Sequence, residues 1–145
     1  MNREFKIIFD QILAISDIKR EFVLGLSGGP DSICLLNLIK DYMKFVKINI
    51  YPVIIDHQIR EKSSLEAQKV KEIAETIGFK SKIKKIHHIV PKSNIQNWAR
   101  FHRRNLLLDE CYLLNADLIL GHHKDDQIET IFMRLLKGSG LQGLI

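Results

Sequence analysis

The chain alternates between two apolar patterns, one typical of helices and one typical of strands. Apolar residues recur three and four positions apart in five segments, which predicts helices over residues 4–15, 31–45, 63–77, 94–115 and 125–137. Short, nearly continuous apolar runs predict buried strands over residues 22–26, 48–56, 82–90 and 116–121. Strands and helices therefore follow one another in turn after a leading helix.

This alternation predicts the fold class. Strands that alternate with helices form right-handed βαβ units, and these units build a parallel sheet. We therefore expect an α/β fold: an open parallel sheet with helices on both faces. Pro52 interrupts the second strand, and because proline lacks an N–H donor, it favours an edge or a bulge there.

The length and composition are those of one globular domain. The chain has 145 residues, of which 46% are hydrophobic and 27% charged. No internal repeat or linker divides residues 1–145, so we expect a single domain. A sheet of this kind normally continues with another strand after "GSGLQGLI", and we therefore expect the C-terminal part of the domain to be missing from this chain.

Several features favour a cytoplasmic protein without a membrane partner. The apolar runs are too short to cross a bilayer, and the charged N-terminus does not resemble a signal peptide. Cys34 and Cys111 are far apart and belong to no paired motif, which suits a reducing compartment. Both cysteines fall in apolar helical patterns, so we expect them to be buried and inert.

The net charge of +5 is unevenly distributed. No acidic residue occurs between Glu75 and Asp109, an interval that holds Lys80, Lys82, Lys84, Lys85, Lys92, Arg100, Arg103 and Arg104. Such a one-sided basic segment is typical of proteins with a polyanionic partner, although charge alone is equally consistent with a solvated face. Trp98 in this segment shares a helical face with apolar positions, so we expect it in the core rather than in a base-stacking platform.

Polar clusters follow three of the four predicted strands. They occupy residues 27–32, 56–60 and 121–126. Parallel strands bring their carboxyl ends to one edge of the sheet, which is where open α/β sheets bind ligands. The sequence therefore predicts a binding site at this edge.

The first cluster, "SGGPDS", has the character of a phosphate cradle. Gly28 and Gly29 let backbone N–H groups approach an anion, and the following helix contributes the positive end of its dipole. Ser27 and Ser32 add hydroxyl donors. No lysine follows as in a Walker loop, and the spacing is not that of the dinucleotide-binding glycine motif.

Asp31 suggests a metal ion at this cradle. A carboxylate beside phosphates is repelled unless a cation lies between them, and Mg²⁺ has the required preference for oxygen ligands. The alternative is an ordinary strand-to-helix turn in which Asp31 is merely the N-cap of the helix.

Five motifs along the chain resemble those of one superfamily. They are SGGPDS (27–32), DHQIR (56–60), NWARFHRRNLL (97–107), HHKDDQIET (122–130) and LLKGSGLQGL (135–144). In this order they resemble the PP-loop ATP pyrophosphatases and, among them, most of all the tRNA(Ile)-lysidine synthetases. Arg104 stands where that family usually has tyrosine.

The resemblance implies a fold, an activity and partners. The fold would be an adenine-nucleotide α-hydrolase-like, PP-loop domain of the Rossmann type. The activity would be ATP-dependent ligation of free L-lysine to C2 of the wobble cytidine in tRNA(Ile) with a CAU anticodon. The reaction would pass through an adenylated tRNA and release pyrophosphate and AMP, with ATP and Mg²⁺ as cofactors. We also expect that the protein can form a homodimer.

The motif positions then receive roles. Nucleotide binding would involve Ser27, Gly28, Gly29, Pro30, Asp31, Ser32, Asp56 and His57. Lysine would be bound by His122, Asp126 and Glu129, the last two of which lie three apart on one helical face. Phosphate or tRNA contacts would involve Arg100, Arg103 and Arg104. We expect Asp31, Asp126 and Arg100 to be catalytic, with Asp31 and Asp126 as metal ligands.

Three other functions stay open at this point. The chain could bind a nucleotide without turnover on its own. It could belong to a tRNA-thiolating PP-loop enzyme, although it lacks the CxxC pairs of such enzymes. It could also be a metal-dependent phosphohydrolase whose ligands are Asp56, His57, His122, His123, Asp125 and Asp126.

Overall fold

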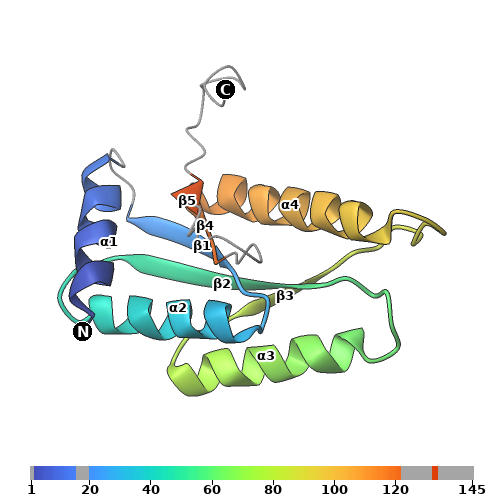
Figure 1. The fold of residues 1–145 in the computed structure, drawn as a ribbon, viewed down its shortest axis with the longest axis horizontal. Coiled ribbons are helices and arrows are strands. Elements are labelled where there is room, and N and C mark those ends of the chain that lie inside the picture. The colour runs from blue at the N-terminus through green and yellow to red at the C-terminus, as the bar shows by residue number, and fades with distance from the viewer. Residues whose placement is uncertain (1, 16–19, 122–131, 134–145) are drawn as a thin grey trace.

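A computed structural model describes residues 2–15, 20–121 and 132–133 of the chain (Figure 1). The elements are, in order, α1 (Arg3–Ile15), β1 (Glu21–Gly25), α2 (Pro30–Tyr42), β2 (Asn49–Asp56), α3 (Ser63–Ile77), β3 (Lys82–Lys85), α4 (Ile95–Leu114), β4 (Asp117–Leu120) and β5 (Phe132–Met133). The first eight confirm the predicted order of helices and strands, although β3 ends five residues earlier than expected.

The sheet has the strand order β3-β2-β1-β4-β5. The first four strands are parallel, which confirms the predicted α/β fold class. β5 is antiparallel to β4 and pairs Phe132 with Ile119 and Met133 with Leu118. The helix expected over 125–137 is therefore wrong at these two residues, where pairing with the edge of β4 prevails over helical periodicity. The rest of that predicted helix lies outside the described residues.

Pro52 lies in a strand that has neighbours on both sides, so its predicted edge position is wrong. Its partner in β1 is Leu24, and pairing with β3 begins only at Val53. The Val53 carbonyl accepts a hydrogen bond from the Leu26 N–H, so the neighbouring Pro52 nitrogen faces the opposite side of the strand. Because β3 has not yet begun there, the missing N–H of proline breaks no ladder bond.

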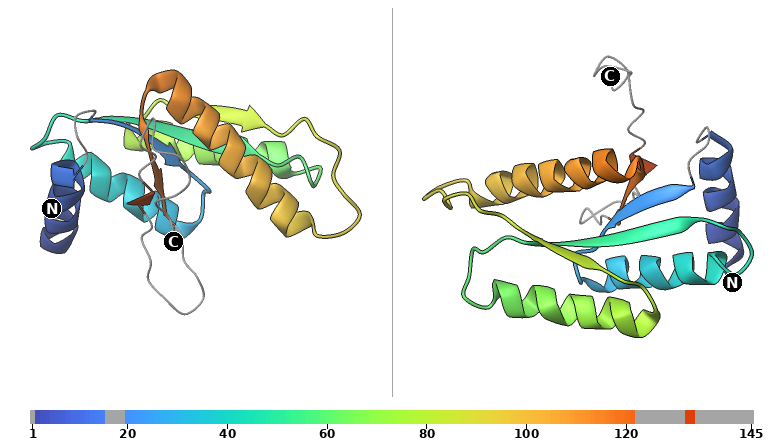
Figure 2. Two further views of the ribbon diagram at one scale, coloured as in Figure 1. Left: turned by 90° about the horizontal axis from the view of Figure 1, so that it is seen from above. Right: turned by 180° about the vertical axis from the view of Figure 1, so that it is seen from behind.

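Helices cover both faces of the sheet, as predicted. Figure 2 shows α4 on one face and α2 and α3 on the other. A hydrophobic core lies on each face of the sheet, and alternate residues of β1 point into one or the other. Phe22 and Leu24 pack toward α1 and α2, and Val23 packs with Leu107 and Leu118 on the face covered by α4. No described helix combines the length and hydropathy that a membrane span requires.

Gly25 lets α4 come close to the centre of the sheet. A Cβ added there would lie 2.5 Å from Cδ2 of Leu120 and 2.9 Å from Cδ1 of Leu107. A side chain at this position would require the two leucine side chains to move. The absence of a side chain at Gly25 therefore lets Leu107 of α4 pack closely against β1.

The two cysteines differ in exposure. Cys111 is buried in the α4 core, as predicted, and burial raises the pKa of its thiol to about 12. Cys34 is exposed, which contradicts the expectation. On α2 it precedes the buried positions Leu35 and Leu36, and the broad apolar pattern of this helix concealed that Cys34 points to solvent.

Candidate functional site

The loop between β1 and α2 makes a turn that requires glycine. Gly28 has a φ of 81°, and a Cβ there would lie 2.2 Å from Cγ2 of Val70 on α3. Gly29 is the N-cap of α2 and Pro30 follows at the start of the helix. The loop thus fits tightly against α3 and points the first turn of α2 toward the carboxyl end of the sheet.

Hydrogen bonds between side chains hold the same loop in shape. The Ser27 hydroxyl donates to Ser32 Oγ at 3.1 Å, and the Ser32 hydroxyl donates to the Gly29 carbonyl at 2.9 Å. Ser32 is buried, while Ser27 and Asp31 are exposed. Because Gly29 is the N-cap, the alternative interpretation of Asp31 as the cap is wrong. Asp31 instead presents its carboxylate from the first turn of the helix.

Asp56, at the end of β2, is buried and holds the next loop. Its Oδ1 accepts a hydrogen bond from the Gln58 N–H at 3.0 Å, and its Oδ2 accepts one from the Ser64 hydroxyl at 2.6 Å. Both oxygens therefore organise the connection to α3. A direct contact between Asp56 and a nucleotide stays a prediction, and the structure gives the residue a positioning role.

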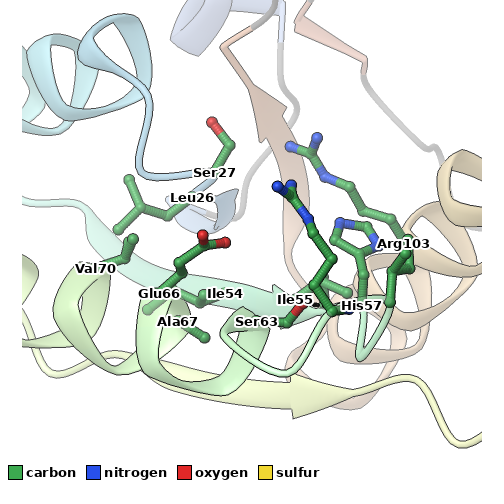
Figure 3. Close-up of a pocket in the computed structure, with 12 residues that line it drawn as sticks. Leu26, Ser27, Ile54, Ile55, His57, Ser63, Glu66, Ala67, Val70 and Arg103 are labelled. Atoms are coloured by element: carbon green, nitrogen blue, oxygen red, sulfur yellow. Dashed lines mark hydrogen bonds between the residues drawn. The ribbon is translucent and has the colours of Figure 1, made fainter. Parts of the chain in front are cut away.

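A pocket of about 200 Å³ lies between the two loops, α3 and α4 (Figure 3). Its lining includes the apolar residues Leu26, Ile54, Ala67 and Val70 and the polar residues Ser27, His57, Arg60, Glu66 and Arg103. This volume is smaller than that of pockets that enclose a whole drug-sized ligand. The pocket therefore suits one part of a ligand whose remainder extends along the loop at Ser27.

Two polar atoms at this pocket lack partners. Nδ1 of His57 and Nη2 of Arg103 are buried without a hydrogen bond within the described part of the chain. Figure 3 shows the two side chains next to each other. Burial lowers the pKa of His57, and the charge of Arg103 lowers it further against the opposing effect of Asp56. Since buried polar groups normally have partners, these two atoms are candidates for contact with a ligand.

Arg103 is the main cationic group of the pocket. It is half-buried, and burial followed by the nearby charge of Arg100 lowers the pKa of its guanidinium. No acidic side chain pairs with it among residues 2–15, 20–121 and 132–133. A desolvated guanidinium without a counterion favours an anionic ligand, and phosphate suits its forked geometry.

The basic segment found in the sequence divides into two groups. Lys82 and Lys84 on β3 both pair with Glu110 on α4, at 3.0 Å for Lys82. Arg100 and Arg104 on α4 are exposed and have no ion pair with any described residue. The first two cations thus belong to the fold, and only the others are free to meet a polyanion.

The third polar cluster begins beside the first. A Cβ added to Gly121, after β4, would lie 3.7 Å from the Ser32 Cα, so the two strand ends meet as predicted. The predicted site residues His122, Asp126 and Glu129 lie outside the described residues, as do His123 and Asp125. The described residues contain no group of three or more potential metal ligands.

Arg60 and Glu66 are pocket residues to which the sequence analysis gave no role. Arg60 lies in the DHQIR motif, and its positive charge could have identified it as a candidate for binding an anion. Glu66 lies one helical turn before Val70, the residue that abuts Gly28. The spacing of Glu66 and Val70 could indicate a place in the pocket only once the packing of α3 against the loop was known.

A mainly parallel sheet with a glycine turn and a helix N-terminus at its carboxyl edge is typical of α/β nucleotide-binding domains. The chain belongs to the PP-loop domain family, which matches residues 1–145. The PP-loop resemblance found in the motifs is thereby confirmed.

Curated relatives carry one name. The chain is 36% identical to the tRNA(Ile)-lysidine synthase of Clostridioides difficile over 94% of its own length and 32% of that protein. It is 38% identical to the enzyme of the same name from Orientia tsutsugamushi, over 86% and 28% of the two chains. It is 34% identical to the enzyme of that name from Bradyrhizobium diazoefficiens, over 98% of this chain and 39% of that protein. The chain thus spans about a third of the length of these relatives.

A solved structure shares the fold. The U34-tRNA thiolase NcsA from Methanococcus maripaludis superposes with a TM-score of 0.68 at 20% identity, over 83% of this chain and 45% of that one. At this identity the likeness supports the PP-loop architecture alone.

Proposed function

We propose that this chain binds ATP, with the nucleoside in the pocket and the phosphates along the loop of Ser27 to Ser32. The observation that carries the proposal is the unpaired Arg103 guanidinium, which shares a pocket with Ser27. The apolar floor at Leu26 and Val70 suits a base, and the carboxylate of Glu66 is an acceptor for ribose hydroxyls.

Asp31 fits the expected Mg²⁺. It is an exposed carboxylate on the first turn of α2, next to Ser32, so it can share a metal shell with phosphate oxygens. The ion would neutralise phosphate charge there. The second expected ligand, Asp126, lies outside the described residues.

For the whole protein we propose ATP-dependent ligation of lysine to C2 of the wobble cytidine in tRNA(Ile) with a CAU anticodon. The names of the relatives support tRNA(Ile) as the substrate. The cytidine O2 is a poor leaving group, and its adenylation, with loss of pyrophosphate, makes it part of departing AMP. The ε-amine of lysine then attacks C2. Positioning and charge neutralisation by residues such as Arg103 would supply the catalysis.

The experiment supplies ATP labelled at the α-phosphate, Mg²⁺, labelled lysine and a CAU-anticodon tRNA. We expect AMP to form only when tRNA is present, together with lysine incorporation into the tRNA. Phosphate release without tRNA would contradict the ligase proposal and favour a phosphohydrolase. AMP formation without lysine incorporation would favour a different acceptor chemistry, such as thiolation, although the chain has no CxxC pair. ATP binding without product would favour a binding module.

An Asp31→Ala variant tests the metal site. We expect it to lose at least about tenfold in Mg²⁺-dependent ATP affinity, since one charged ligand typically contributes more than 1.4 kcal/mol. Asp41→Ala is the matched control, because Asp41 lies at the other end of α2 and pairs with Lys44 at 2.6 Å. Equal affinities for the two variants, measured by equilibrium dialysis, would contradict the role of Asp31.

A further inference from the structure

Four aromatic rings gather where α4 begins. The ring of His102 stacks on His88 with centroids 4.2 Å apart and contacts Trp98 edge-on at 4.8 Å. Phe101 meets His102 at 5.4 Å with its ring nearly perpendicular. We call His88, Trp98, Phe101 and His102 the aromatic platform.

The aromatic platform lies at the surface. Phe101 is 61% exposed, and nearby Ile89 is 94% exposed. Trp98 and His102 are half-buried and His88 is exposed, so the expected core position of Trp98 is only partly reached. None of the four rings belongs to either buried core cluster. Aromatic surface left open in this way is typical of a contact site.

Three exposed cations lie close in sequence to the aromatic platform. Arg100 and Arg104 are exposed on the same stretch of α4, and Lys92 is exposed in the preceding loop. None of the three pairs with a described acidic group. Exposed rings among unpaired cations are the combination that binds single-stranded nucleic acid, in which bases stack on rings and phosphates meet the cations.

The aromatic platform and the nucleotide pocket both use residues from the first turns of α4. α4 begins at the end of the sheet where β1 and β2 terminate (Figure 2). Arg103, which lines the pocket, directly follows His102 in the sequence. Because consecutive helical residues point about 100° apart, the rings and Arg103 lie on different sides of α4 at the same end of the sheet.

We propose that the aromatic platform stacks an unpaired base of a single-stranded RNA segment, while Lys92, Arg100 and Arg104 bind its phosphates. The identification of this RNA as a tRNA anticodon loop rests on the proposed function. Burial and the neighbouring His88 lower the pKa of His102, which favours its neutral form.

Trp98 reports on this surface directly, because it is the only tryptophan in the chain. The full chain is titrated with a CAU anticodon stem-loop RNA and, separately, with polyphosphate as an anion without bases. We expect the RNA to quench or shift Trp98 fluorescence, and polyphosphate to bind more weakly without that change. An equal spectral response to both anions would overturn stacking and leave only electrostatic attraction.

The variant Phe101→Leu keeps apolar bulk but removes the stacking ring. We expect it to weaken RNA binding about tenfold, the range for loss of one base–ring contact. Phe45→Leu is the matched control, because Phe45 is similarly exposed at 66% and lies outside α4. Identical RNA affinities of the two variants, measured by fluorescence anisotropy of labelled RNA, would overturn the proposal.

ATP-dependent lysine incorporation is measured on the whole protein, with and without the Phe101→Leu substitution. If wild type ligates lysine and Phe101→Leu binds RNA as tightly as wild type, the platform proposal fails and the ligase proposal stands. If RNA binds on the platform but no lysine is incorporated, the ligase proposal fails alone.

Discussion

Arg103 and Glu110 lie seven residues apart on α4, two helical turns along the same side. They differ in whether their charge is paired with an opposite charge among the described residues. Glu110 is buried and receives hydrogen bonds from Lys82 and Lys84. Burial alone would raise its pKa, but the two lysines outweigh burial and hold it below its usual value. Arg103 has no acidic partner among the described residues, and one of its nitrogens is buried unbonded.

The difference separates a structural charge from a functional one. Glu110 ties α4 to the edge strand β3, so its counterions are part of the fold. Arg103 is half-buried beside a pocket and has no acidic partner among the described residues, so it is a candidate for binding an anionic ligand. On one helix, therefore, the pairing among described residues distinguishes a residue that stabilises the domain from one that is a candidate for ligand binding.

Removing the structural charge should have the largest effect. We expect Glu110→Gln to lower the free energy of unfolding by about 2 kcal/mol, because it leaves two lysines uncompensated. The loss stays below the usual range for a buried pair because the Lys82 side chain is 59% exposed and can turn to solvent. Urea unfolding measures it. Glu75→Gln is the control, since its pair with Lys71 at 3.9 Å is on the surface.

Removing the functional charge should change binding rather than stability. We expect Arg103→Met to weaken ATP binding about tenfold, the value of a hydrogen bond to a charged group. Its unfolding free energy should be unchanged or slightly higher, because an unpaired, partly desolvated cation is lost. The control is Arg104→Met, at an exposed position. A stability loss in Arg103→Met as large as that in Glu110→Gln would remove the contrast between the two residues.

The smallest effect concerns His57. Because the charge of Arg103 lowers the pKa of His57, Arg103→Met should raise it, and Arg104→Met should leave it unchanged. NMR titration of the imidazole protons measures this shift. A lowered native pKa means that His57 favours the folded state at neutral pH and that this contribution is lost as pH falls below its unfolded value near 6.5. The variant should lose less stability on acidification than wild type.

The fold could be predicted largely from periodicity, and the pairing of charges could not. The turn at Gly28 follows from the local sequence, and Arg103 was a candidate for binding phosphate or tRNA because it lies in a basic helical segment. Glu110, by contrast, meets Lys82 across 28 residues, and no local pattern indicates that contact. For Asp56, the motif identified an important carboxylate but could not tell whether its oxygens face a ligand or its own loop.

The register of the central strand has a consequence for synthesis on the ribosome. β1 pairs with β2 on one side and with β4 on the other. Phe22 therefore has no strand partner on the β4 side until Asp117 has been synthesised. At the usual speed of translation, one edge of this apolar strand stays open for roughly 5 to 20 seconds. During that interval it can pair with other nascent chains, and early shielding of that edge by a chaperone would raise the yield of folded protein.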